Sequence, residues 1–160
     1  MNALSYLQLA EPIRKALHAA RDRIAAGFRV DRIVLFGSVV RGTADDESDV
    51  DLLIVLREMP DHHIRNRMSS VILDINLEYD TNLSGLVVDQ KAWDEGLLSV
   101  LPIHDEVEEQ GVAVLRHQLP DGRLEDVSHG QLGHQGTGGQ AAIDGDVEQR
   151  AKERTNWRSG

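Results

Sequence analysis

The chain has 160 residues, a formal net charge of −10 and no cysteine. This length allows one ordinary domain with its own hydrophobic core, and the lack of cysteine excludes disulfides, thiolate metal sites and a cysteine nucleophile. The acidic balance argues against stable nucleic-acid binding by the free chain, although a divalent cation lets an acidic protein bind a single nucleotide.

The sequence also indicates where the protein works. Its first residues, MNALSYLQLAEPIRK, have neither the basic start nor the long apolar stretch of a signal peptide. The longest apolar run, residues 52–56, is far too short to cross a bilayer. We therefore expect a soluble, cytoplasmic protein that does not bind a membrane.

The first third of the chain predicts one helix and two strands. Residues 12–26 carry apolar side chains at spacings of three and four, which predicts an amphipathic helix that ends at Gly27. Residues 33–36 form a short apolar run rich in β-formers, and residues 50–56 form a second one; both are typical of strands. Residues 37–48, rich in Gly, Ser, Thr and acids, predict a loop with room for one helical turn.

Further elements follow in the same order along the chain. Residues 61–79 predict a long helix capped by Asp61, and residues 83–88 predict a third strand. A short helix containing Trp93, a helix over 103–110 and a last strand over 112–115 complete the pattern. This alternation predicts an α/β (α+β) fold, in which a small mixed β-sheet is flanked by helices.

The composition changes after residue 116. Residues 117–160 contain eight of the fourteen glycines, and their few large apolar residues follow no period. Such a segment buries too little apolar surface to offset the entropy of ordering it. We expect a folded domain over 1–116 and a disordered, Gly-rich tail over 117–160.

Candidate chemistry lies between the first two strands. Gly37 and Ser38 follow the first strand, and Asp49 and Asp51 begin the second. Because side chains alternate along a strand, both aspartates are expected on one face, with Leu53 and with Val55 further along. The opposite face is then expected to carry Val50, Leu52, Ile54 and Leu56.

Two carboxylates on one strand face repel each other unless a cation lies between them. Mg²⁺ binds one or two protein carboxylates together with substrate phosphates. Gly37 allows close approach of a phosphate, Ser38 supplies a hydroxyl and backbone N–H groups, and Arg41 can reach a phosphate oxygen. The arrangement suits attack on the α-phosphorus of a nucleoside triphosphate with one or two Mg²⁺ ions. The alternative is an acidic surface hairpin in which the same residues only shape a turn.

The stretch GSVVRGTADDESDVD resembles the active-site signature of the polymerase-β-like nucleotidyltransferase superfamily. Its Gly-Ser, ten residues, Asp-x-Asp spacing and the small chain resemble the minimal nucleotidyltransferase branch, and the similarity extends over about residues 10–115. The resemblance implies a nucleotidyltransferase fold, Mg²⁺ at Asp49 and Asp51, and ATP phosphates at Gly37 and Ser38. In antitoxin members it implies AMP transfer to a tyrosine hydroxyl of a HEPN-domain toxin.

The sequence departs from this family at one residue. Active members bring a third carboxylate from a following strand, and our alignment puts Ser84 there. Serine neither binds Mg²⁺ as an anion nor acts as a base at neutral pH. Two hypotheses therefore remain: an ATP- and Mg²⁺-dependent adenylyltransferase acting on a protein partner, or a weakly active or inactive protein of the same fold that neutralises its partner by contact. Transfer to a small molecule is less expected, because the tail does not look able to form an acceptor-binding domain.

Overall fold

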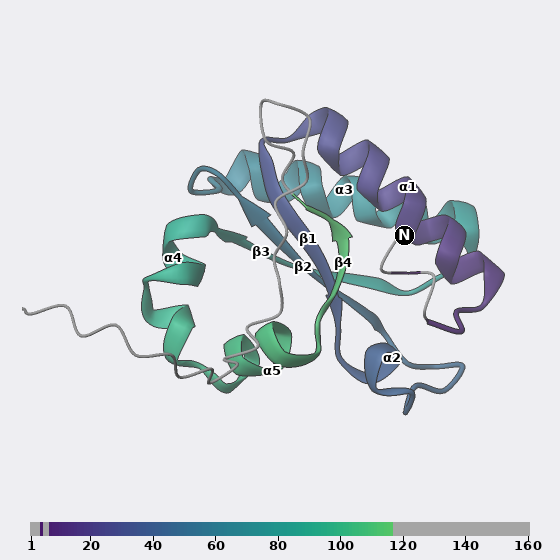
Figure 1. Cartoon of the computed structure of the whole chain (residues 1–160). Helices are drawn as coiled ribbons and strands as arrows, with labels where there is room; N and C mark the ends of the chain where they lie inside the picture. The colour runs from purple at the N-terminus through teal and green to yellow at the C-terminus, as the bar shows by residue number, and fades with distance from the viewer. Residues whose placement is uncertain (1–3, 5–6, 117–160) are drawn as a thin grey trace, which may run out of the picture. The chain divides into compact units, whose positions relative to one another are not determined.

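The computed structural model describes residue 4 and residues 7–116. The expected tail over 117–160 lies outside the described residues, so both its disorder and the domain boundary at residue 116 stay predictions. Figure 1 gives the arrangement of the helices and strands. In chain order these are α1 (Glu11–Gly27), β1 (Val30–Phe36), α2 (Ser38–Arg41), β2 (Val50–Leu56), α3 (His62–Tyr79), β3 (Leu83–Asp89), α4 (Gln90–Asp94), the 3₁₀ helix η2 (Leu97–Val100), α5 (Pro102–Gln110) and β4 (Val112–Leu115).

The strands form a four-stranded mixed sheet in the order β3-β2-β1-β4. β1 is antiparallel to both β2 and β4, whereas β2 and β3 are parallel. Parallel neighbours need a crossover connection, and α3 supplies it between β2 and β3. The fold is therefore the expected mixed α/β fold with a small helix-flanked sheet.

Both faces of the sheet are covered. The larger core joins α1 and α3 to one face and includes four β2 residues, Val50, Leu52, Ile54 and Leu56. The smaller core lies on the other face, where Leu53 and Val55 pack with Trp93 of α4 and Val107 of α5. The alternation expected along β2 is confirmed, and the two faces meet different helices (Figure 1).

Two expected elements differ in extent. β1 begins at Val30 rather than at residue 33, because Asp31 and Arg32 interrupt the apolar pattern yet belong to the strand. Arg32 Nη1 donates to Asp31 Oδ2 at 2.9 Å, which offsets the burial of this carboxylate. The expected short helix around Trp93 consists of α4 and the separate 3₁₀ helix η2.

The long helix α3 begins and packs as its sequence indicates. Asp61 caps it, with Oδ1 accepting from the backbone N–H of Ile64 at 2.8 Å. Its buried side chains Met68, Ile72 and Ile75 face the sheet. Among the described residues, no helix is long and apolar enough to cross a membrane.

Candidate active site

The two aspartates lie where β1 ends and β2 begins. Asp51 is the second residue of β2 and pairs across the sheet with Phe36, the last residue of β1. Gly37 and Ser38 follow Phe36 directly, so the antiparallel β1–β2 pair brings them to the same edge as Asp51. The hairpin thus joins segments more than ten residues apart, as the Gly-Ser and Asp-x-Asp spacing predicts.

The charge of Asp51 is unfavourable in this environment. Burial raises the pKa of Asp51 above its ordinary value of 3.8, and the negative charges of Asp49 and Glu106 raise it further. The guanidinium of Arg41 acts in the opposite direction but does not cancel these effects. A divalent cation between the carboxylates would relieve the repulsion.

Gly37 lies against the carboxylate of Asp51. A Cβ added at Gly37 would lie 2.6 Å from Asp51 Oδ2, a distance that real Cβ atoms do not adopt. Gly37 also has φ +79° and ψ −153°, a region open essentially only to glycine. The backbone conformation therefore requires glycine here, and a Cβ would also force the carboxylate of Asp51 to shift.

One helical turn follows Gly37 and closes the loop. This turn, α2, ends at Gly42 with φ +71°, and the backbone N–H of Thr43 donates to the carbonyl of Ser38 at 3.0 Å. Ser38 is half-buried. The turn holds the backbone of Gly37 and Ser38 beside the two aspartates, which is the arrangement expected of a phosphate-binding loop.

Arg41 is paired within the protein. Its Nη1 donates to Oε1 of Glu106, which lies on α5. Sequence reasoning assigned Arg41 to phosphate and did not single out Glu106, since the two residues are 65 positions apart. Only the packing of α5 brings Glu106 to the site.

Asn82 is a second residue that sequence reasoning missed. Its Nδ2 donates to Asp49 Oδ1, and its carbonyl accepts from the backbone N–H of Val50 at 2.9 Å. Asn82 immediately precedes β3. It therefore orients Asp49 from the position just before the neighbouring strand, and the parallel pairing of β2 with β3 was the feature needed to find it.

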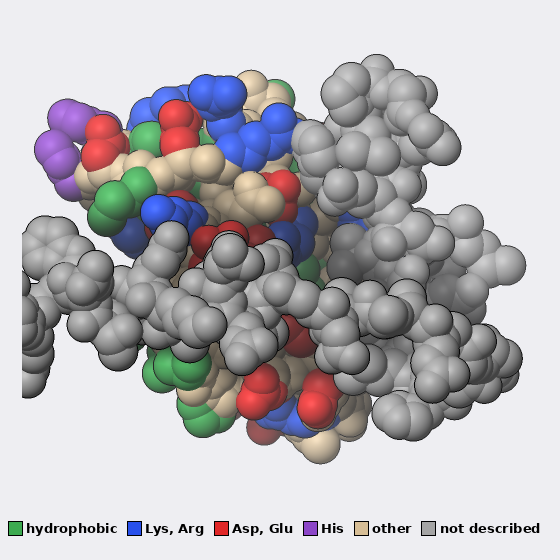
Figure 2. All heavy atoms as spheres, turned by 60° about the vertical axis from the view of Figure 1, so that its left-hand side comes forward, with side chains coloured by type: hydrophobic (Ala, Val, Ile, Leu, Met, Phe, Trp, Pro, Cys, Tyr) green, Lys and Arg blue, Asp and Glu red, His purple; other side chains and the backbone are tan. Residues whose placement is uncertain are grey.

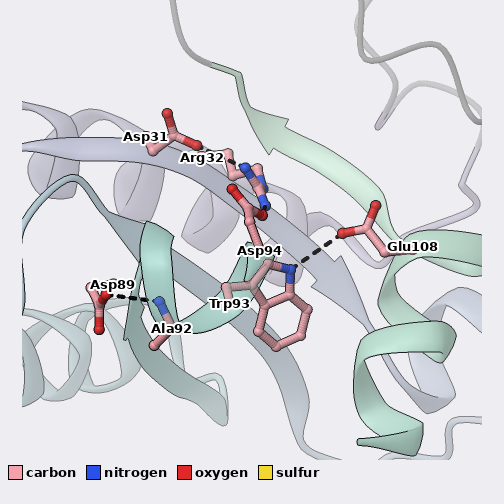
Figure 3. A network of polar contacts seen from close by, with 7 residues as sticks. All are labelled: Asp31, Arg32, Asp89, Ala92, Trp93, Asp94 and Glu108. Carbon is pink, nitrogen blue, oxygen red and sulfur yellow. Dashed lines mark hydrogen bonds and ion pairs between the residues drawn. The ribbon is translucent and has the colours of Figure 1, made fainter. Parts of the chain in front are cut away.

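Ser84 lies beside Asp51 on the sheet. The two residues are register partners in the parallel β2–β3 ladder, and Ser84 is exposed. Asp80 ends α3 as its C-cap, and Asp89 pairs with Leu56 at the far end of β2. Figure 3 shows Asp89 capping α4, where its Oδ1 accepts from the N–H of Ala92 at 2.9 Å. Neither acid therefore takes the place beside Asp51.

The donor set fits Mg²⁺. The described residues contain no group of three or more His, Cys, Asp or Glu side chains that could hold a metal. Asp49 and Asp51 would offer a cation two carboxylates. Mg²⁺ commonly binds in this way, with substrate phosphates and water completing its coordination. Burial, followed by the negative charges of Asp49 and Glu106, raises the pKa of Asp51, and a cation held there would offset these effects.

The α4–α5 layer is fixed to the sheet by a polar network around a buried tryptophan (Figure 3). Trp93 is fully buried, and its Nε1 donates to Glu108 Oε1 at 3.2 Å. Its neighbour Asp94 accepts from Arg32 Nη2 of β1 at 2.5 Å. These contacts hold α5, and with it Glu106, over the face of the sheet that carries Asp51.

A cavity of about 280 Å³ lies at the other end of β2. It is lined by residues of the α1 C-terminus, the β2 C-terminus and α3, including Arg29, Leu56 and Arg67. Figure 2 shows Lys and Arg side chains gathered in the upper part of one face, with Asp and Glu side chains among them and further acidic side chains in the lower part. Because Leu56 pairs with Val30 and Asp51 with Phe36, this cavity is separate from the carboxylates.

Comparisons with known proteins give the family of this chain and several relatives. Residues 13–110 match the family described as the nucleotidyltransferase domain. A Methanocaldococcus jannaschii protein is 36% identical to this chain over 86 residues, which cover 54% of this chain and 80% of that protein. Its name describes it as a protein adenylyltransferase, an assignment that the name marks as provisional. Protein adenylyltransferase MntA of Thermococcus cleftensis is 39% identical over 80 residues, covering 49% of this chain and 72% of that protein. A crystal structure of a toxin–antitoxin with AMP-PNP has 25% sequence identity and a TM-score of 0.42, covering 67% of this chain and 73% of that one.

Proposed function

This chain belongs to the nucleotidyltransferase domain family, and on that basis we propose that it transfers AMP from ATP to a protein partner in a Mg²⁺-dependent reaction. The observation that carries the proposal is the pair of carboxylates at one edge of the sheet, with Asp51 against the Gly37 turn and Asp49 bonded to Asn82. The names of the two archaeal relatives support a protein as acceptor. The proposed compartment is the cytoplasm.

The partner that we propose is a HEPN-type toxin, as the resemblance to antitoxin-type minimal nucleotidyltransferases implies. The relative named MntA covers 80 residues of similarity and supports this branch of the family. The attacking group on such a partner is a hydroxyl, and a tyrosine hydroxyl is the acceptor that the resemblance implies.

Each residue of the site has a proposed role. Asp49 and Asp51 hold the cation, with Asn82 orienting Asp49. The backbone N–H groups and hydroxyl of the Gly37–Ser38 turn bind phosphate oxygens, and Arg41 binds another once it leaves Glu106. When bound, Mg²⁺ neutralises charge that develops on the phosphates.

The reaction balances without a further cofactor. The acceptor oxygen forms a bond to the α-phosphorus, the bond from that phosphorus to the β-phosphate bridging oxygen breaks, and pyrophosphate leaves. The proton of the acceptor hydroxyl passes to water or to a nearby carboxylate. The product is an AMP phosphodiester on the partner.

A second function is favoured by Ser84. An exposed hydroxyl, rather than a carboxylate, is the register partner of Asp51, so the site has one fewer candidate base and metal ligand. On this alternative the chain keeps the nucleotidyltransferase fold and neutralises its partner by direct contact, with weak or no transfer.

One experiment separates the two functions. ATP labelled on the α-phosphate is incubated with Mg²⁺ and with the product of the adjacent gene as the candidate partner, using wild type and Asp49→Asn/Asp51→Asn. A matched control, Asp46→Asn/Glu47→Gln, removes the same charge from exposed residues of the preceding loop. We expect label on the partner with wild type and control only.

The opposite result has a clear meaning. If no variant transfers label, yet wild type and Asp49→Asn/Asp51→Asn bind the partner equally, the enzyme proposal is wrong and the binding function stands. Label transferred equally well by Asp49→Asn/Asp51→Asn would reject the assignment of these two residues.

A further inference from the structure

The ion pair between Arg41 and Glu106 joins two elements that frame the site. Arg41 ends the single turn of α2, and Glu106 lies in the middle of α5. Both side chains are partly exposed, at 44% for Arg41 and 32% for Glu106. The pair is therefore accessible to a ligand, and water screens it enough for a competing anion to replace the carboxylate.

Glu106 also contributes charge to the carboxylate centre. Glu106 is bonded to Arg41, and the charges of both residues act on Asp51, so the carboxylate of Glu106 lies near those of Asp49 and Asp51. In the described part of the chain, three carboxylates therefore act on a small region, and Arg41, which offsets them, already has Glu106 as its partner. A triphosphate that enters without a cation meets this negative field while Glu106 still holds Arg41.

The neighbours of Glu106 restrict how far it can withdraw. The next residue, Val107, is buried in the core under α5, and Glu108 accepts from the indole N–H of Trp93. The backbone of α5 is thus fixed, and only rotation of the Glu106 side chain is free. Glu106 consequently stays near the site after it releases Arg41.

From these contacts we infer that Glu106 makes nucleotide binding depend on the divalent cation, by occupying Arg41 until a cation-loaded triphosphate displaces it. This role rests on the proposed function, because it assumes that the site binds a triphosphate. Glu106 acts through Arg41 and is a positioning residue. It prevents the protein from holding free ATP in a state that cannot react.

The mechanism is a thermodynamic coupling between two ligands. The cation reduces the repulsion between the phosphates and the three carboxylates, so each ligand improves the affinity for the other. Replacement of Glu106 by glutamine keeps the shape of the side chain but removes its charge. The variant therefore has a freer Arg41 and a weaker negative field, and its coupling between Mg²⁺ and ATP is smaller.

Calorimetric titration of the full chain tests this inference. Dissociation constants for ATP and for inorganic tripolyphosphate are measured with Mg²⁺ and with a chelator, for wild type and Glu106→Gln. We expect Glu106→Gln to bind both ligands about three- to tenfold more tightly than wild type in the chelator, since one charge–charge contact is removed. With Mg²⁺ the difference between the two proteins shrinks.

Two control variants identify the cause. Glu109→Gln makes the same charge change on an exposed residue of α5, and we expect it to bind as wild type does in both conditions. Arg41→Gln/Glu106→Gln lacks the guanidinium, and we expect it to lose most of the gain seen with Glu106→Gln alone. Thermal unfolding of each variant shows that the fold is retained.

The outcomes separate this inference from the proposed function. If wild type binds ATP with Mg²⁺ but Glu106→Gln gains no affinity in the chelator, the role of Glu106 is wrong and the proposed function stands. An equal gain in Glu109→Gln also overturns it, since general charge would then be the cause. If no protein binds ATP or tripolyphosphate under any condition, both the inference and the proposed function are rejected.

Discussion

The charge of Asp51 lowers the stability of the fold, whereas the proposed binding of a cation needs that charge. Its carboxylate is half-buried, lies near two other negative charges and touches the turn at Gly37. A carboxylate whose pKa is raised on folding is protonated more readily in the native state than in the unfolded chain. Its ionisation therefore costs stability, and that cost is present at neutral pH.

Substitution of Asp51 by asparagine should stabilise the protein at neutral pH. Below the ordinary pKa of 3.8, Asp51 is protonated in both the folded and the unfolded protein. As the pH rises from there through the higher pKa of the folded state, ionisation of Asp51 lowers the free energy of unfolding. We expect Asp51→Asn to gain about 0.5 kcal/mol at pH 7 in urea unfolding, a small value because solvent screens the site. The gain should disappear near pH 3, and exposed Asp46→Asn should show none of it.

A gain that is independent of pH would contradict this account. It would mean that asparagine stabilises through packing or hydrogen bonding rather than through the missing charge.

Gly37 provides a second test at the residue scale. Gly37→Ala should lower the free energy of unfolding by about 2 kcal/mol, because its backbone region costs about 1–3 kcal/mol for other residues and the new Cβ meets Asp51 Oδ2. Gly42→Ala is the matched control, since it also has positive φ but no atom within 4 Å of its Cβ. Urea unfolding and ATP binding are measured for both variants. Equal effects of Gly37→Ala and Gly42→Ala on ATP binding would show that the contact between residue 37 and Asp51 is unimportant for binding.

At the scale of elements, the α4–α5 layer controls what surrounds the site. It packs on the sheet face that carries Asp51, and it delivers Glu106 to Arg41. Trp93 is the largest fully buried side chain in the described part of the chain. Its ring lies 4.9 Å from that of His104, and its N–H bonds to Glu108, so it links α4 to α5.

Removal of Trp93 should loosen this layer. Trp93→Ala is expected to lower the free energy of unfolding by about 3–5 kcal/mol, because it leaves a large cavity and an unpaired Glu108. Trp93→Phe keeps most of the volume and should cost clearly less. Chemical denaturation measures both, and a cost below about 1 kcal/mol for Trp93→Ala would show that α4 and α5 do not depend on this contact.

At the scale of the whole molecule, β2 belongs to both cores. Its alternate residues pack with α1 and α3 on one face and with Trp93 and Val107 on the other. The proposed ligand site is at the N-terminal end of this strand. A ligand that binds Asp49 and Asp51 is therefore expected to stabilise the entire described fold and not only a loop.

Mg²⁺ and ATP together should raise the unfolding temperature. At a ligand concentration about 100 times the dissociation constant, the expected stabilisation is about 2.7 kcal/mol. Each ligand alone should give a smaller shift, because the phosphates and the carboxylates repel each other without the cation. Differential scanning calorimetry measures the shifts, and Asp49→Asn/Asp51→Asn should lose the combined one. An undiminished shift in that variant would place the nucleotide elsewhere on the protein.

Much of the fold followed from local pattern. Residues close together in the sequence encode the helices α1 and α3 and the strand β2 through the spacing of their apolar side chains. The cap at Asp61 is encoded in the same local way. The spacing of Gly37, Ser38, Asp49 and Asp51 is likewise local, because one antiparallel hairpin brings the four residues together. Their proposed roles in binding and catalysis stay predictions.

Sequence pattern failed where distant residues compensate each other. The start of β1 was missed because Asp31 and Arg32 are polar, and their burial is tolerated only through bonds that include Asp94. The break between α4 and η2 was missed as well, because the apolar spacing of this segment gave no sign of it.

By itself the sequence determined the mixed α/β fold and the alternation of side chains between the two faces of β2. It also determined that the Gly-Ser and Asp-x-Asp motifs lie at the ends of neighbouring strands. Only the tertiary structure decided that Glu106 holds Arg41 and that Asn82 holds Asp49. The physical reason is the range of the interactions. Backbone periodicity and turns are set by residues close in sequence, whereas these two contacts arise from the pairing of β3 with β2 and from the packing of α5.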